Sequence, residues 1–214
     1  MTTRRPARIE RRAFCDELAR LGPDQPTLCS PWTTKDLAAH IVVRERRPDA
    51  AAGITLPFLS SHTAAVQAKT AASTSFDQLI DMIQNPPWFS LAAFGATDNA
   101  TNTAEFFIHT EDARRAQPGF TARGLDPAVT RVLAGQLKLM TRLRLRRFPG
   151  LITINLNGYA EPLIAGSNAG PELTMTGDVG EITLFLSGRQ RASDVQLDGP
   201  DHLVERLRSA DLGL

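Results

Sequence analysis

The spacing of apolar residues changes once along this chain, at Phe148-Pro149-Gly150, and that change constrains the fold most. Before it, apolar residues recur every three or four positions, as they do on one face of a helix. After it, Ile152, Ile154 and Leu156 alternate with polar residues, which is the period of a half-buried strand. The 214 residues therefore predict an α+β protein, with a helical bundle over residues 1–148 and a small α+β domain over 149–214.

Local signals place the elements. In the first domain, helices are expected over 6–21, from Thr33 onward, over 61–72, from 75 to 85, over 102–116 and from 126 to the domain boundary. Thr33 and Asp36 have the spacing of a capping box. The aromatic residues between Trp88 and Phe94 are interpreted as core or as a lid. In the second domain, strands are expected near 152–156, 162–165, 173–176 and 195–197, and helices over 178–187 and 200–212.

Three side chains stand out as possible metal ligands. Glu105 and His109 are four residues apart, so on a helix they project from the same face. His40, on the second helix, can supply a third ligand. Two imidazoles and one carboxylate with an open fourth position are typical of catalytic zinc. The order of residues is unlike the His-Glu-x-x-His helix of metalloproteases.

A plainer interpretation stays open, because a Glu four residues before a His is also a common surface pair. The neighbours Phe106 and Phe107 favour the metal, since they predict a buried helix, and a buried carboxylate beside an imidazole needs a partner. Asp36 is interpreted as a helix cap, with orientation of His40 as the alternative. Asp112 is expected to return towards the ligand face as a hydrogen-bond acceptor.

Composition narrows the function classes. A formal net charge of +1 gives no overall field that would favour nucleic acid or an anionic membrane. No apolar run approaches the roughly 20 residues of a membrane span, and the N-terminus lacks the apolar core of a secretory signal. Cys15 and Cys29 are expected to be inert reduced thiols of a cytoplasmic protein. Lysine occurs only three times among 24 basic residues, which fits a GC-rich, actinobacterial source.

The segment from Trp32 to His40 and the run over 102–118 resemble the mycothiol-dependent maleylpyruvate isomerase family. This family belongs to the DinB-like group of metal-binding four-helix bundles. The run over 102–118 is especially similar to one actinobacterial branch. Residues 150–214 are similar to the family's C-terminal domain, which itself resembles sterol carrier proteins.

The resemblance implies a set of roles. His40, Glu105 and His109 match the family's metal ligands, and Arg189, in Leu186-Ser187-Gly188-Arg189, matches its C-terminal arginine. It implies a divalent metal, expected to be Zn²⁺, that binds the thiol mycothiol as a thiolate. The thiolate would attack a conjugated double bond in an isomerisation, or a carbon bearing a leaving group in a transfer. Arg189 is the predicted catalytic residue for small electrophilic acids, and Arg114 and Arg115 are predicted to bind the cofactor.

Two other classes of function remain open. A fold does not fix a function, so the chain is alternatively a non-catalytic module that binds metal or thiol, or a carrier of an apolar ligand. A metal-dependent hydrolase is the third hypothesis, although the sequence places no clear general base beside the site.

Overall fold

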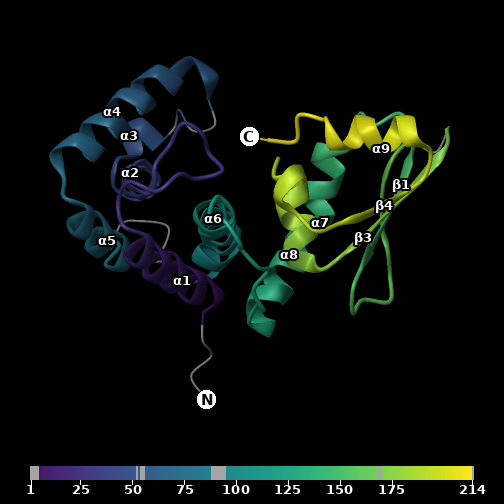
Figure 1. The fold of residues 1–214 in the computed structure, drawn as a ribbon, viewed down its shortest axis with the longest axis horizontal. Coiled ribbons are helices and arrows are strands. Elements are labelled where there is room, and N and C mark those ends of the chain that lie inside the picture. The colour runs from purple at the N-terminus through teal and green to yellow at the C-terminus, as the bar shows by residue number, and fades with distance from the viewer. Residues whose placement is uncertain (1–4, 52, 54–55, 88–94, 168–169, 214) are drawn as a thin grey trace. The chain divides into compact units, whose positions relative to one another are not determined.

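The computed structural model describes residues 5–51, 53, 56–87, 95–167 and 170–213, with backbone alone at 57 and 95–101 (Figure 1). Its contacts separate into two compact units, Met1–Gly124 and Leu125–Leu214. The predicted α+β class, with a helical N-terminal region and a small C-terminal sheet, is confirmed.

The first unit is helical. It comprises α1 (Pro6–Leu21), α2 (Thr34–Arg46), α3 (Pro48–Ala51), the 3₁₀ turn η2 (Pro57–Leu59), α4 (Ser60–Ser73), α5 (Phe76–Gln84) and α6 (Gly95–Arg115). Pro6 begins α1 at a position where a missing N–H costs nothing, and Gly22, at φ 82°, ends it. Thr33 and Asp36 form the predicted capping box at α2, and Ser75 and Gln78 form another at α5.

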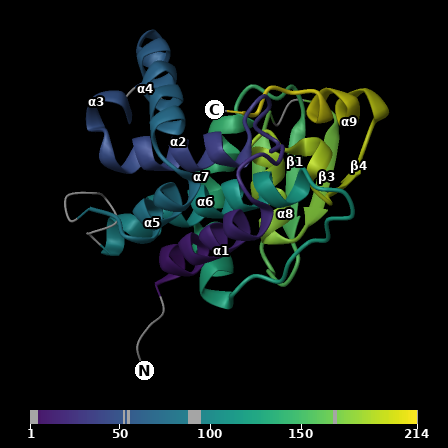
Figure 2. The same cartoon turned by 60° about the vertical axis from the view of Figure 1, so that its left-hand side comes forward.

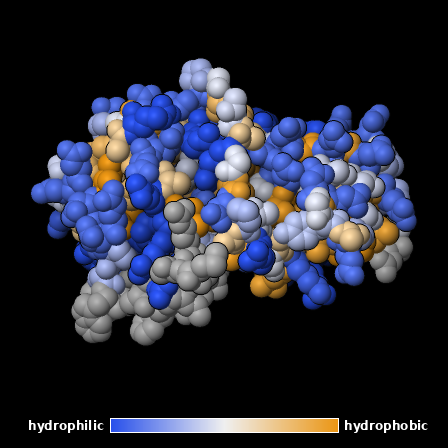
Figure 3. Space-filling view, turned by 90° about the horizontal axis from the view of Figure 1, so that it is seen from below, coloured by the Kyte–Doolittle hydropathy of each residue, from blue (hydrophilic) through white to orange (hydrophobic). Residues whose placement is uncertain are grey.

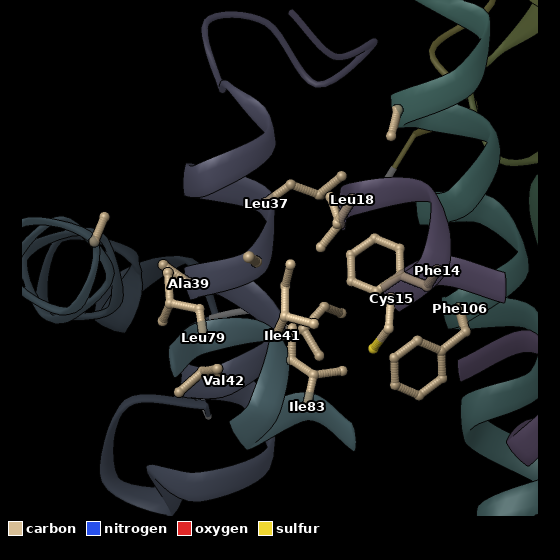
Figure 4. Packing of buried hydrophobic residues seen from close by; sticks show 14 residues of the cluster. Phe14, Cys15, Leu18, Leu37, Ala39, Ile41, Val42, Leu79, Ile83 and Phe106 are labelled. Atoms are coloured by element: carbon tan, nitrogen blue, oxygen red, sulfur yellow. The ribbon is translucent and has the colours of Figure 1, made fainter. Parts of the chain in front are cut away.

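Helices α1, α2, α5 and α6 make up the bundle: α1 packs against α6 and α5, and α2 packs against α5 and, on another side, α4. Figure 4 shows the buried cluster between them, in which Phe14 and Leu18 of α1 meet Leu37 and Ile41 of α2. Phe106 of α6 lies 5.8 Å from Phe14 between ring centroids. This packing fixes how α2 and α6 present the side chains of the candidate site.

The second unit contains α7 (Pro127–Arg144), β1 (Leu151–Leu156), β2 (Leu163–Gly166), β3 (Glu172–Gly177), α8 (Val179–Leu186), η4 (Gln190–Ala192), β4 (Gln196–Asp198) and α9 (Asp201–Arg208). The sheet order is β2-β1-β3-β4, with β1 and β3 parallel and both outer pairs antiparallel. The register pairs Ile152 with Leu173 and Ile154 with Met175, and all four are buried. Helices α7 and α8 lie beside one another next to this sheet (Figures 1 and 2).

Helix α7 differs from expectation. A helix from 126 to the boundary at 148 is predicted to belong to the helical bundle, whereas α7 packs against α8 and β2 and clusters with the second unit. Its buried stripe is Val129, Leu133, Leu137 and Thr141, a spacing of four, and Leu143 is exposed. A division into domains at 148 stays a prediction.

The surface shows no large apolar area on the face seen in Figure 3, where hydrophilic residues predominate and hydrophobic residues form small separate patches. Among the helices that the structure describes, none is both long enough and apolar enough to span a membrane.

Candidate metal centre

The three predicted ligands come together. His40 lies in α2, and Glu105 and His109 lie one turn apart in α6. Glu105 Oε1 is 3.7 Å from His40 Nε2 and 3.4 Å from His109 Nε2. One donor atom from each residue falls within 4.8 Å of both others. The two imidazole rings meet edge to face, with centroids 5.3 Å apart.

These separations fit a metal better than they fit hydrogen bonds. A good N–H···O hydrogen bond measures about 2.7–3.2 Å, which is shorter than both contacts. A tetrahedral ion with bonds of about 2.0–2.1 Å holds its donor atoms roughly 3.3 Å apart. The donor set of two imidazoles and one carboxylate also matches the ligands of catalytic zinc. The residues present therefore fit a divalent ion.

Both imidazoles are oriented through their other nitrogen. His109 Nδ1 lies 2.9 Å from Asp112 Oδ2, and His40 Nδ1 lies 3.3 Å from Gln67 Oε1. Gln67 Nε2 donates to the backbone oxygen of Asp36, at 3.5 Å, so its amide oxygen faces the histidine and accepts from Nδ1–H. Hence the Nε2 lone pairs of both histidines face Glu105, as in metal sites whose histidines are held by outer partners.

The predictions for the supporting residues had different outcomes. Asp112 does return to the ligand face as an acceptor, as expected. The side chain of Asp36 caps α2 by accepting from Thr33, and its role near His40 is limited to its backbone oxygen. Gln67 was not identified from the sequence, because α4 carries no pattern that marks it. Trp32 lies against the His40 ring, at 5.0 Å between centroids.

Burial and neighbouring groups shift the pKa values of all three side chains. Burial lowers the pKa of His40. Burial alone would raise the pKa of Glu105, but the nearby His109 and His40, with the charge of Arg44, hold it well below its usual range. Burial alone would lower the pKa of His109, yet Asp112, Cys29 and Glu105 raise it well above its usual range.

Arg44 is a further member of the site, which no motif in the sequence singles out. It lies one turn after His40, and its Nε is 3.2 Å from Glu105 Oε1. Its Nη1 donates to Asn102 Oδ1 at 2.6 Å. The side chains of Arg44 and Glu105 are 18% and 21% exposed, against 9% and 11% for His40 and His109. Solvent therefore reaches the cluster on the side of Arg44 and Glu105.

The two cysteines differ. Cys15 is buried, and burial raises the pKa of its thiol to about 12, so it fits the expectation of an inert thiol. The thiol of Cys29 is half-buried and donates to Asp112 Oδ2 at 3.1 Å. Cys29, His109 and Asp112 form a second group of close donor atoms, on the Nδ1 side of His109. The loop is held there by the Leu28 N–H, which donates to the Asp112 backbone oxygen.

The structure gives Arg114 and Arg115 partners within the protein. Glu111, which is fully buried, accepts from Arg114 Nη1 at 2.9 Å and from Arg115 Nε at 2.6 Å. Arg123 donates to the same carboxylate at 2.7 Å and also pairs with Glu10 of α1. These contacts hold the end of α6 and the following segment on α1. Cofactor binding by the two arginines stays a prediction without support from this geometry.

Other predicted residues lie in scattered places. Arg189 follows α8 in the second unit, is half-buried, and donates from Nη1 to the Ser187 backbone oxygen at 2.5 Å. His62 is exposed, and its Nε2 lies 3.6 Å from Asp49 Oδ2. The aromatic residues between Trp88 and Phe94 lie outside the described residues.

Comparison of the sequence with protein-family models and with curated proteins finds no match. Two solved structures are similar to the chain, a mycothiol-dependent maleylpyruvate isomerase and its variant with one histidine replaced by alanine. Their TM-scores are 0.54 and 0.52, each at 14% identity and over 90% of both chains. The chain therefore has the fold of mycothiol-dependent maleylpyruvate isomerase.

Proposed function

We propose that this protein is a metal-dependent enzyme that uses a low-molecular-weight thiol, mycothiol, to isomerise small electrophilic acids or to transfer the thiol to them. The observation that carries the proposal is the convergence of His40 Nε2, His109 Nε2 and Glu105 Oε1 at the separations of a metal's ligands. The likeness in fold to a mycothiol-dependent isomerase supports the choice of thiol.

A divalent ion, which we propose to be Zn²⁺, would supply an open position at which a thiol is held as a thiolate near neutral pH. The chain's own residues prepare that position. Gln67 and Asp112 orient the two imidazoles, and Glu105 adds a negative charge on the more exposed side. The Trp32 ring lies against His40 and shields it from water. We assign Arg189 to the carboxylate of the substrate, because a guanidinium matches that group with two parallel hydrogen bonds.

The test begins with metal content. Protein purified without a histidine tag should contain about one zinc per chain, and His109→Ala should lose it, because the site then keeps one imidazole and one carboxylate. His62→Ala removes an exposed histidine and is the matched control. Equal metal in wild type and His109→Ala, measured by elemental analysis, would contradict the proposed site.

The second measurement follows the thiol. Mycothiol should react with conjugated or halogenated acids faster in the presence of the protein than alone, and the acceleration should vanish with a chelator and in Glu105→Gln. Bound metal and bound thiol without acceleration would favour a binding module. Metal without thiol binding would leave hydrolysis as the enzymatic hypothesis.

A further inference from the structure

A basic side chain stands at the open side of the proposed metal site. Arg44 is one turn from His40 in α2, and its Nε contacts the same Glu105 oxygen that faces both imidazoles. Arg114 and Arg115, by contrast, are paired with the buried Glu111 at the far end of α6. Arg44 is thus placed nearer to the reacting position than either.

The Arg44 guanidinium is held rigidly and keeps donors to spare. Asn102, which is buried, accepts from Nη1, and Glu105 contacts Nε, so the plane of the group is fixed at two points. A guanidinium carries five N–H donors in one planar fork. In the part of the chain that the structure describes, Nη2 makes no hydrogen bond. Nη2 lies in the same guanidinium plane as Nε, which contacts the carboxylate of Glu105.

Charge also favours an anion there. With a divalent ion and neutral imidazoles, the ion and Arg44 contribute three positive charges, and Glu105 and Asp112 contribute two negative ones. The surplus of one positive charge lies where the cluster is most exposed. An anionic group that enters beside Glu105 would meet both the surplus charge and the spare donors.

We infer that Arg44 is a specificity-determining residue, which binds a carboxylate of the electrophilic acid that enters beside the open metal position. This inference rests on the proposed metal site and deepens it. It names the ligand class as an electrophile that bears a carboxylate close to its reacting carbon, and it gives Arg44 a role beyond that of a partner for Glu105.

The experiment uses the full-length protein, stripped of metal and reloaded with Co²⁺, whose visible absorption reports on ligands at the ion. It is titrated with 3-mercaptopropionate, whose thiol binds the ion and brings a carboxylate beside it in place of the substrate's, and with 2-mercaptoethanol, which has no carboxylate. Wild type should bind the carboxylate thiol more tightly. In Arg44→Met that affinity should fall about 10- to 100-fold, the usual effect of losing a charged hydrogen bond, while binding of 2-mercaptoethanol changes little. Arg44→Lys should have an intermediate affinity for 3-mercaptopropionate, because a lysine ammonium keeps the positive charge but lacks the planar set of N–H donors.

Arg46→Met is the matched control. Arg46 is a basic residue of the same helix, but its guanidinium donates to the backbone oxygens of Met82 and Asn85. This variant should bind both thiols as wild type does. Equal losses for the two thiols in Arg44→Met, or no loss for either, would overturn the inference. So would loss of Co²⁺ from Arg44→Met, since the guanidinium would then serve to hold Glu105. Failure of wild type to bind Co²⁺ would instead refute the proposed metal site.

Discussion

At the scale of single residues, the candidate site depends on side chains that never touch the ion. His40 and His109 each have two ring nitrogens, and a metal can use only one that lacks a proton. Gln67 and Asp112 each accept a hydrogen bond at Nδ1, which leaves Nε2 free towards Glu105. Gln67 is itself oriented by the Asp36 backbone oxygen, so one buried amide sets the tautomer of His40.

Gln67→Leu should weaken metal binding about 10- to 100-fold, because His40 loses the acceptor that fixes its ring and tautomer. Gln67→Glu should retain the affinity, since a carboxylate is a stronger acceptor for Nδ1–H. Competition with a zinc chelator measures both, with circular dichroism to establish that the helices are intact. A leucine variant that binds zinc as tightly as wild type would show that Gln67 does not orient His40.

At the scale of elements, a buried ionic cluster holds the end of α6 against α1. Glu111 of α6 accepts from Arg114, Arg115 and Arg123, and Arg123 also contacts Glu10 of α1. Loss of one member of a buried ion pair leaves an uncompensated charge, which costs more than the pair contributes. The cluster lies about one turn from His109, so it stabilises the helix that carries two of the three proposed ligands.

Glu111→Gln should lower the free energy of unfolding by about 3–5 kcal/mol at neutral pH, because three arginines lose their shared carboxylate. Burial alone would raise the pKa of Glu111, but Arg115 and Arg123 lower it. The stabilisation is therefore present above the ordinary pKa of a glutamate and is lost as the pH falls through the lowered value. The difference between variant and wild type in denaturant unfolding should narrow below about pH 4.

Glu17→Gln is the control for this prediction. Glu17 pairs with Arg20, whose side chain is 63% exposed, and an exposed pair contributes little to stability. If the two variants are equally stable at neutral pH, the buried cluster is not what holds α6 on α1.

At the scale of the whole molecule, the chain divides into two compact units after Gly124. All three proposed ligands, with Gln67, Asp112 and Arg44, precede that point. Helix α7 follows Gly124. It buries Leu133 and Leu137 and packs against α8 and β2. The unit that holds the proposed site is thus complete without α7.

A fragment of residues 1–124 should be helical and retain its zinc. A fragment of residues 1–148, which ends at the boundary expected from the sequence, should also bind zinc but carry α7 without its partners. Its residues after 124 should then be cleaved rapidly in limited proteolysis, because exposed apolar side chains leave that helix unsupported. Protection of α7 in the longer fragment would place α7 with the bundle. A folded short fragment without zinc would mean that a ligand lies in the second unit.

Local patterns account for much of the outcome. The bounds of α1, the capping box at Thr33, and the change to strands after Gly150 follow from interactions within a few residues, which the sequence displays directly. The pairing of Glu105 with His109 likewise follows from one helical turn. By itself, therefore, the sequence determined the element types, the order of helices before sheet, and two adjacent members of the site.

The tertiary structure decided the contacts between residues far apart in the chain. It placed His40 opposite Glu105, brought Gln67 from α4 to His40, and set Cys29 against Asp112. It also paired Arg115 with Glu111 and placed α7 within the second unit. No local pattern encodes such contacts, because they depend on how apolar faces of separate helices pack together. That packing selects which polar side chains meet, and so it decided the surroundings of the proposed metal.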